Sequence, residues 1–236
     1  MESEETKTEE IAALLAEART HVQHITANLP VIVDPLETMQ LTTARAPHFA
    51  LCIREVQTWR AEEFARAACD MFERGDLVVG VSNVRGAVES VAVIWYLKCL
   101  IEAEIERGVA DPNIYDKFRQ IYLGSRSEEA LPQAINVITM LKRLEKDIPG
   151  VWRGYERMSD FCHPNYQGAL AVFCKHDRET HIAYFGRGIR NNLYPAKLGL
   201  RSLVGALGLL QYAYNKIADM NDPFCSACGK ALGDAA

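Results

Sequence analysis

The sequence predicts a mainly α-helical protein, a bundle of about six helices with one small β-hairpin inserted before the last helix. Three observations lead to this prediction. Apolar residues recur at three-and-four spacing over long segments, which is typical of helices with one buried face. Proline and glycine stand where such segments begin and end. A β-type pattern, two short apolar runs around a polar turn, occurs at about 169–185.

The first 30 residues predict a single N-terminal helix, because apolar side chains line one face of residues 5–28 and Pro30 then stops the helix. Residues 31–46 contain Pro35 and no clear periodicity, so we expect an irregular connector. The apolar face consists of Ile11, Leu14, Leu15, Ala18, Val22 and Ile25.

The helical bundle is expected over residues 47–219. Pro47 is well placed to open a long helix that stops at Gly75, and the next helix covers 77–107. This second helix is apolar and long enough to span a bilayer, but it carries polar and charged side chains, so we expect a buried helix of a soluble protein. These side chains are Asn83, Arg85, Glu89 and Lys98.

Shorter helices are expected at 112–124, 132–148 and 151–162. The hairpin would then pair the apolar runs Ala169–Phe173 and His181–Phe185. The last helix, at 196–219, contains three glycines that we expect to lie close to a neighbouring helix, since glycine otherwise weakens a helix. They are Gly199, Gly205 and Gly208.

The composition limits the function classes. The 236 residues carry a net charge of -5, so long-range attraction to nucleic acid or to an anionic membrane is not expected without a local basic patch. The acidic N-terminus lacks the basic start and apolar run of a secretory signal, which predicts a cytoplasmic protein with reduced thiols. The sequence contains no nucleotide-binding glycine-rich loop and no nucleophile elbow.

Two charged residues stand on an otherwise apolar helix face. Arg85 and Glu89 are four residues apart and share this face with Val81, Val88 and Ala92. Charges in such a place are costly unless they are paired. We therefore expect an ion pair between Arg85 and Glu89 with further partners elsewhere in the chain.

The segment YERMSDFCHPN provides candidates for these partners. Tyr155, Ser159 and His163 follow at intervals of four, which puts them on one polar ridge of a helix. Pro164 disfavours the α conformation at His163 and so places the imidazole at the helix end. There the imidazole could titrate near neutral pH and serve in general acid-base chemistry, with Asn165 as a further polar neighbour.

These residues give the chain a resemblance to the HEPN superfamily of helical domains. The mark of that superfamily is an arginine and a histidine with four to six residues between them, and Arg157 and His163, with five between them, match it at the end of a bundle helix. An RGAVES helix followed later by YERMSDFCHPN is also similar to uncharacterised bacterial proteins. The resemblance covers residues 48–215 by the order of elements.

The resemblance implies a metal-independent endoribonuclease that works as a homodimer on RNA, with no cofactor needed for catalysis. Arg157 would contact the phosphate, His163 would transfer the proton and Glu89 would orient them, with Arg85, Tyr155, Ser159 and Asn165 in support. The sequence departs from the family in two respects. Met158 follows Arg157 where active members usually have a polar residue. A regular helix would also place Arg157 and His163 about 120 degrees apart, so they converge only if the helix ends early or a dimer supplies the other half of the site.

An alternative interpretation needs no catalysis. The set Arg85, Glu89, Tyr155, Ser159 and His163 could form a buried polar network that fixes the register of two helices. The protein would then be a helical interaction or structural protein. The exposure of His163 to solvent distinguishes the two hypotheses.

A basic stretch follows the hairpin, in a segment without acidic residues from 180 to 218. Glycines and the pair Asn191–Asn192 could present backbone N–H groups there to a phosphate. The alternative is that the basic side chains pair with acidic groups of the surface. The candidate phosphate-binding residues are Arg187, Arg190, Lys197 and Arg201.

Residues 220–236 form the expected C-terminal tail, which contains Cys225 and Cys228 at the spacing of half a zinc ribbon. A structural zinc would need two more ligands. These could be Cys174 with His176, Cys162 with His163, or the same cysteine pair of a second subunit. Otherwise the tail is flexible and its thiols are reduced.

Overall fold

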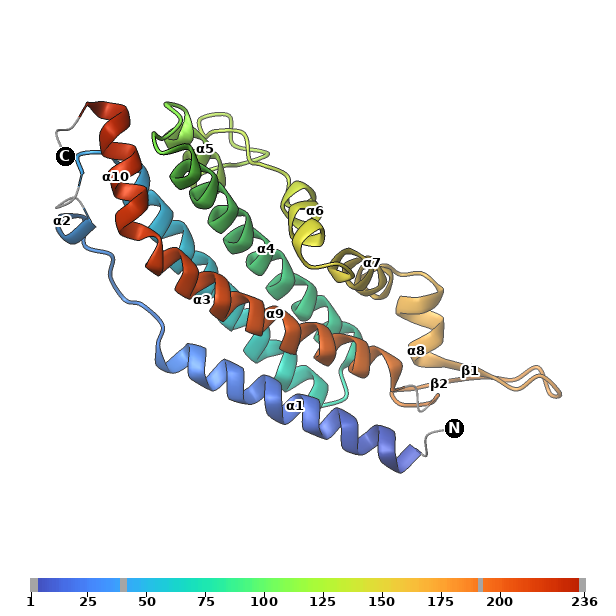
Figure 1. The fold of residues 1–236 in the computed structure, drawn as a ribbon. Coiled ribbons are helices and arrows are strands. Elements are labelled where there is room, and N and C mark those ends of the chain that lie inside the picture. Colours follow the sequence, from blue (N-terminus) through green and yellow to red (C-terminus); the bar gives the residue numbers. More distant parts are fainter. Residues whose placement is uncertain (1–3, 39–41, 191–192, 234–236) are drawn as a thin grey trace. The chain divides into compact units, whose positions relative to one another are not determined.

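The protein is mainly α-helical, as the sequence predicts (Figure 1). The computed structural model describes residues 4–38, 42–190 and 193–233, and these contain ten α-helices, one π-helix and two strands. The helices are α1 (Glu4–Ala27), α2 (Pro35–Thr38), α3 (Ala46–Glu73), α4 (Leu77–Arg107), α5 (Ile114–Tyr122), α6 (Val137–Asp147), α7 (Val151–Cys162), the π-helix η1 (Tyr166–Leu170), α8 (Ala171–Phe173), α9 (Tyr194–Asp219) and α10 (Asn221–Leu232). The strands are β1 (Cys174–His176) and β2 (Ala183–Phe185).

The chain divides into two compact units, each assembled from three separate segments. Unit 1 comprises Met1–Asn28, Arg60–Glu89 and Ile148–Gly208. Unit 2 comprises Leu29–Trp59, Ser90–Asp147 and Leu209–Ala236. Each of the helices α3, α4 and α9 is divided between the two units.

In unit 1, the ring of Phe72 lies against two glycines of different helices. A Cβ atom added to Gly80 of α4 would lie 2.8 Å from this ring, and one added to Gly199 of α9 would lie 2.5 Å from it. The prediction of a close approach at Gly199 is therefore confirmed. The prediction is wrong for Gly205 and Gly208. Apart from the adjoining backbone of α9 and the chain neighbours, no atom of the described residues lies within 4 Å of a Cβ added at either position.

Because of this difference within one helix, we expect alanine substitutions at Gly199 and Gly205 to change the free energy of unfolding in opposite directions. Gly199→Ala should lower the free energy of unfolding by about 1–2 kcal/mol, because its methyl group would lie 2.5 Å from the buried ring of Phe72 and the ring would have to shift. Gly205→Ala should raise it by about 0.5–1 kcal/mol, because alanine has the higher helix propensity. Urea unfolding followed by circular dichroism measures both changes. Equal effects of the two substitutions would show that the packing of Phe72 is not what requires glycine at position 199.

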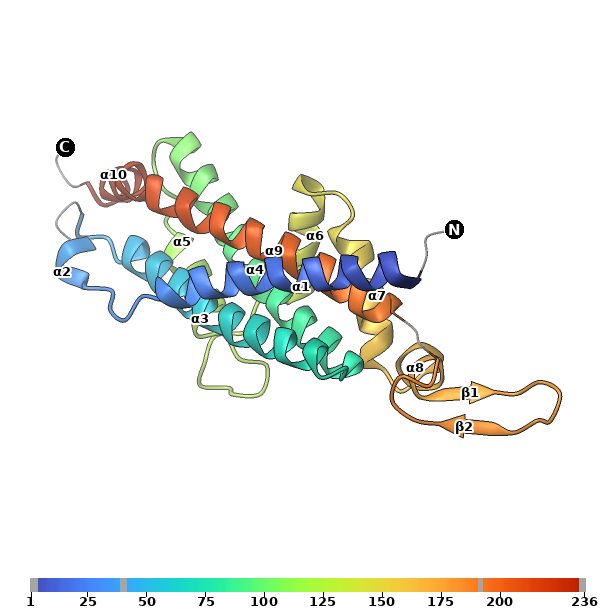
Figure 2. The same cartoon turned by 90° about the horizontal axis from the view of Figure 1, so that it is seen from below.

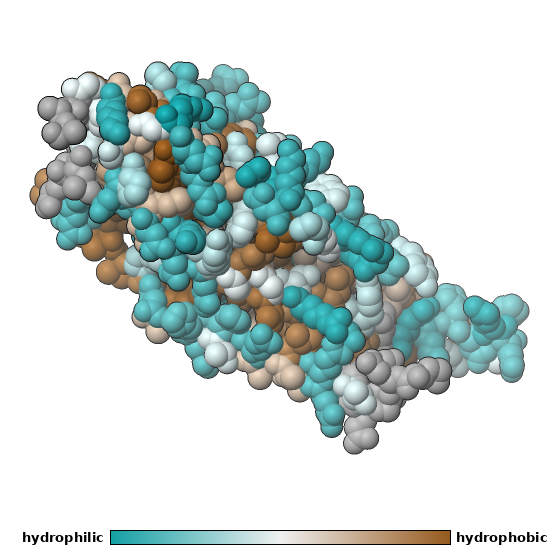
Figure 3. Space-filling view, in the orientation of Figure 1, coloured by the Kyte–Doolittle hydropathy of each residue, from teal (hydrophilic) through white to brown (hydrophobic). Residues whose placement is uncertain are grey.

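The hairpin of unit 1 is shorter than the sequence predicts. Only Cys174–His176 and Ala183–Phe185 pair, antiparallel, with Cys174 opposite Phe185. The run Ala169–Phe173, expected to be a strand, is helical and belongs to η1 and α8. Figures 1 and 2 show the hairpin extending away from the helices of unit 1, and in Figure 3 hydrophilic side chains cover its tip.

In unit 2, the C-terminal segment packs on the helices instead of forming a tail. Residues Asn221–Leu232 form α10, and the ring of Phe224 contacts that of Phe118 at a centroid distance of 5.9 Å. The backbone N–H of Ala110 also donates to the carbonyl of Ala227. The expectation of a flexible tail is therefore wrong for residues 221–232, because an apolar helix face anchors them.

The central helix α4 has the length and hydropathy of a membrane span. It is the one such helix within the described parts of the chain. In its most apolar stretch of 18 residues, 56% is buried inside the protein. Burial of this kind is typical of the core helix of a soluble protein, which agrees with the interpretation from its charged residues.

Candidate functional site

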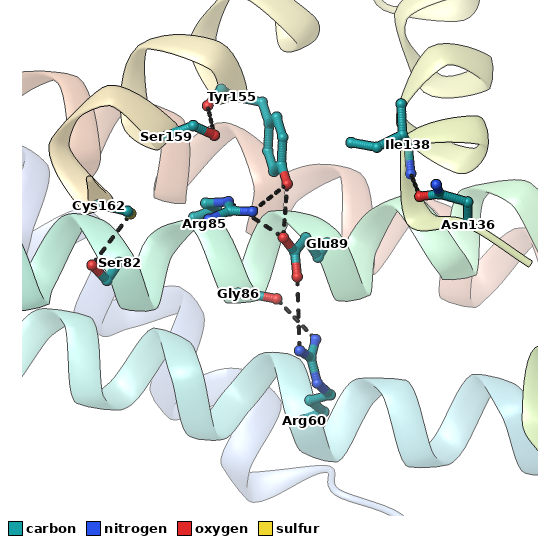
Figure 4. A network of polar contacts seen from close by, with 10 residues as sticks. All are labelled: Arg60, Ser82, Arg85, Gly86, Glu89, Asn136, Ile138, Tyr155, Ser159 and Cys162. Atoms are coloured by element: carbon teal, nitrogen blue, oxygen red, sulfur yellow. Dashed lines mark hydrogen bonds and ion pairs between the residues drawn. The ribbon is translucent and has the colours of Figure 1, made fainter. Parts of the chain in front are cut away.

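Four polar side chains from three helices of unit 1 meet in one network (Figure 4). The Tyr155 hydroxyl of α7 donates to Oε1 of Glu89 at 2.8 Å and accepts from Nη2 of Arg85 at 2.9 Å. Nε of Arg85 lies 3.4 Å from the same Glu89 oxygen. From α3, Nη2 of Arg60 lies 3.9 Å from Oε2 of Glu89, and Nη1 donates to the carbonyl of Gly86 at 3.1 Å.

The helical spacing of the sequence accounts for half of this network. Arg85 and Glu89 are one turn apart on α4 and pair as expected. Tyr155 then approaches from α7, where its ring stacks on Trp152 and lies under the Arg85 guanidinium, 5.0 Å from ring centroid to Cζ. The predicted association of Arg85, Glu89 and Tyr155 is thus present in the structure.

The environment of the network raises the pKa values of Tyr155 and Arg85. Burial raises the pKa of the Tyr155 hydroxyl, and the nearby Glu89 carboxylate raises it further against the opposing effect of Arg85. The hydroxyl therefore remains protonated at neutral pH and can donate to Glu89. Burial alone would lower the pKa of Arg85, but the hydrogen bond to Tyr155 and the charge of Glu89 outweigh it and the pKa is raised.

Sequence reasoning missed three residues of this region. Arg60 lies on α3 among charged and small residues, and no local pattern distinguishes it from a solvated arginine. Cys162 was considered only as a buried thiol or a zinc ligand, yet its Sγ lies 3.3 Å from Oγ of Ser82. Ser82 stands three residues before Arg85 and seven before Glu89 on α4, so the helical period places it on the same face and could have pointed to it.

Two of the predicted supporting residues have other roles. The Ser159 hydroxyl donates to the Tyr155 carbonyl at 2.9 Å, a contact within its own helix. The Asn165 side chain caps η1, since its Oδ1 accepts from the N–H of Gly168 at 3.0 Å. Neither side chain reaches the Glu89 carboxylate through a hydrogen bond.

The two residues assigned to catalysis lie outside the network. His163 is exposed, so the alternative interpretation is wrong in placing it within a buried polar network. Its backbone angles are extended (φ -90, ψ 147) at the end of α7, as expected before Pro164. Arg157 is exposed on α7, two residues after Tyr155. Among the described residues, no hydrogen bond or ion pair joins Arg157 or His163 to Glu89, and the three side chains are not brought together as one site.

The basic residues after the hairpin find partners inside unit 1. Arg187 pairs with Asp76 at 2.6 Å, and Arg190 donates to the Cys174 carbonyl. Lys197 and Arg201 both contact the carboxylate of Glu10. The carboxylate contacts of Arg187, Lys197 and Arg201 agree with the alternative interpretation, in which basic side chains pair with acidic groups of the surface. The pair Asn191–Asn192 lies outside the described residues.

The two candidate zinc ligands are buried on one face of α10 in unit 2. Burial raises the pKa of Cys225 to about 11 and that of Cys228 to about 12, so both thiols are protonated at neutral pH. Within the described residues, no group of three His, Cys, Asp or Glu side chains is arranged to hold a metal ion. The structural zinc stays a prediction.

Comparisons of the chain with known protein families, with curated proteins and with solved structures gave no match. The resemblance to the HEPN superfamily therefore stays a prediction that depends on Arg157 and His163.

Proposed function

We propose that this protein is a non-catalytic helical interaction protein in which the network of Arg60, Arg85, Glu89 and Tyr155 joins α3, α4 and α7. One observation supports this above the others: both carboxylate oxygens of Glu89 already contact side chains of unit 1. A carboxylate engaged in this way fixes the register of helices and has little freedom to orient a catalytic pair. Two further statements stay predictions: the protein forms a homodimer, and it resides in the cytoplasm.

The structural role of the network can be tested at Tyr155. Tyr155→Phe should lower the free energy of unfolding by about 1–2 kcal/mol, because it removes one hydrogen-bond partner each from Arg85 and Glu89. The matched control is Tyr166→Phe, also in unit 1 but 57% exposed, which should change it by less than about 0.5 kcal/mol. Urea unfolding provides the measurement. If the two variants are equally stable, the network does not hold the helices together.

RNA cleavage through His163 is the second candidate. Its support is the exposure of this residue two positions before the N-cap of a π-helix, an element often found at functional sites. The purified protein should be incubated with RNA in EDTA and compared with His163→Ala, whose fold is verified by circular dichroism. No cleavage by either protein is the result we expect. If the wild-type protein cleaves RNA and the folded variant does not, the proposal of an interaction protein is wrong and the protein is a metal-independent ribonuclease.

A further inference from the structure

Unit 1 contains a cavity that the network does not use. It has a volume of about 380 Å³ and lies beside the turn between α3 and α4. This volume is at the lower end of the range for small-molecule pockets. Most of its wall is apolar and comes from α1, α3, α4, α8 and α9 with the residue before α9. The apolar wall residues are Ile11, Phe72, Leu77, Val172, Leu193 and Ala196.

Two arginines also line the cavity. Arg74 belongs to the turn after α3, and Arg187 follows the hairpin. Asp76 holds both, with Oδ2 at 3.3 Å from Nε of Arg74 and Oδ1 at 2.6 Å from Nη1 of Arg187. The Asp76 side chain is only 12% exposed, whereas those of Arg74 and Arg187 are 66% and 73% exposed.

This arrangement leaves a positive charge at an apolar cavity. Two guanidinium groups face one carboxylate, so the local balance of Arg74, Arg187 and Asp76 is one positive charge. A guanidinium carries five N–H donors, and an ion pair through one nitrogen leaves donors for a second anionic group. Asp76 thus positions the two arginines without occupying them fully.

We propose that this cavity binds a small amphiphilic anion, with its apolar part against the cavity wall and its carboxylate or phosphate group between Arg74 and Arg187. An apolar wall favours a hydrocarbon body over a sugar, because it offers few partners for buried hydroxyl groups. The two arginines recognise the anionic end. The site shares no residue with the network around Glu89, so its existence does not depend on whether the protein cleaves RNA.

Isothermal titration calorimetry with decanoate tests the proposal on the full-length protein. Decanoate should bind, decanol should bind at least about tenfold more weakly, and inorganic phosphate alone should not bind measurably. Arg74→Glu and Arg187→Glu should each weaken decanoate binding about tenfold or more. Arg178→Glu is the matched control, because it makes the same charge change in unit 1, on an exposed residue of the hairpin turn outside the cavity, and should leave the affinity within about twofold.

Several results would overturn the proposal. Equal affinity for decanoate and decanol would show that the arginines do not recognise the head group, and binding of phosphate as tight as that of decanoate would indicate a simple anion site. If both Arg→Glu variants still bind decanoate with unchanged affinity, the binding site lies elsewhere in the protein. Binding to phosphatidylcholine–phosphatidylglycerol vesicles without binding of free decanoate would indicate a membrane surface and no discrete pocket.

Discussion

Phe72→Ala is expected to lower the free energy of unfolding by about 3–5 kcal/mol, the loss typical of a buried phenylalanine. The ring is 8% exposed and lies where Gly80 and Gly199 let two helices come close to it. Removing it would leave a void that these helices could fill only by moving toward each other. The substitution also removes part of the wall of the proposed binding cavity.

The matched control is Phe185→Ala, which makes the same chemical change in the hairpin of the same unit. Its side chain is 74% exposed, so the loss should stay below about 1 kcal/mol. Urea unfolding followed by circular dichroism compares the two variants with the wild type. A similar, small loss in both would mean that Phe72 does not anchor α3, α4 and α9.

The long helices could be predicted from the sequence because their signals are local. Gly75 and Gly108 follow the ends of α3 and α4, and Pro47 lies in the first turn of α3. The four-residue spacing of Arg85 and Glu89 likewise predicted their ion pair. Arg60 could not be found in this way, because its contact with Glu89 joins residues far apart in the sequence.

The run Ala169–Phe173 shows where local signals fail. A short apolar run fits a strand as well as a buried helical turn, and periodicity does not distinguish them. Its helical form depends on tertiary packing, since Ala171 and Val172 are buried in unit 1. The choice between the two structures is therefore made by contacts that the sequence does not display.

The expectation of a flexible C-terminal tail fails for a different reason. The spacing of Cys225 and Cys228 fits half a zinc ribbon, but Asp222–Pro223 in the first turn and Gly233 after the last are ordinary helix signals. The same spacing of three also places both cysteines on one helix face, where they are buried. A pair of cysteines inside a capped amphipathic segment thus fits a buried helix face as well as a zinc ribbon.

The exposed segment around His163 is held by a tight backbone arrangement at Gly168. A Cβ atom added there would lie 2.1 Å from the carbonyl oxygen of His163 and 2.5 Å from that of Phe161. Both are backbone atoms, which cannot turn aside as a side chain could. The N–H of Gly168 is also held by the Asn165 side chain, so the start of η1 has little room to adjust.

Gly168→Ala should therefore lower the free energy of unfolding by about 3 kcal/mol, at the upper end of the cost of overpacking. The control Gly186→Ala, in the same unit, adds its methyl group where no described atom lies within 4 Å and should change stability by less than about 0.5 kcal/mol. Urea unfolding measures both. If Gly168→Ala is as stable as the control, the end of α7 is free to move, and His163 could then approach Arg157 as the ribonuclease hypothesis requires. A large loss confined to Gly168→Ala would instead mean that the backbone of His163 is fixed by packing, which favours the structural role of this segment.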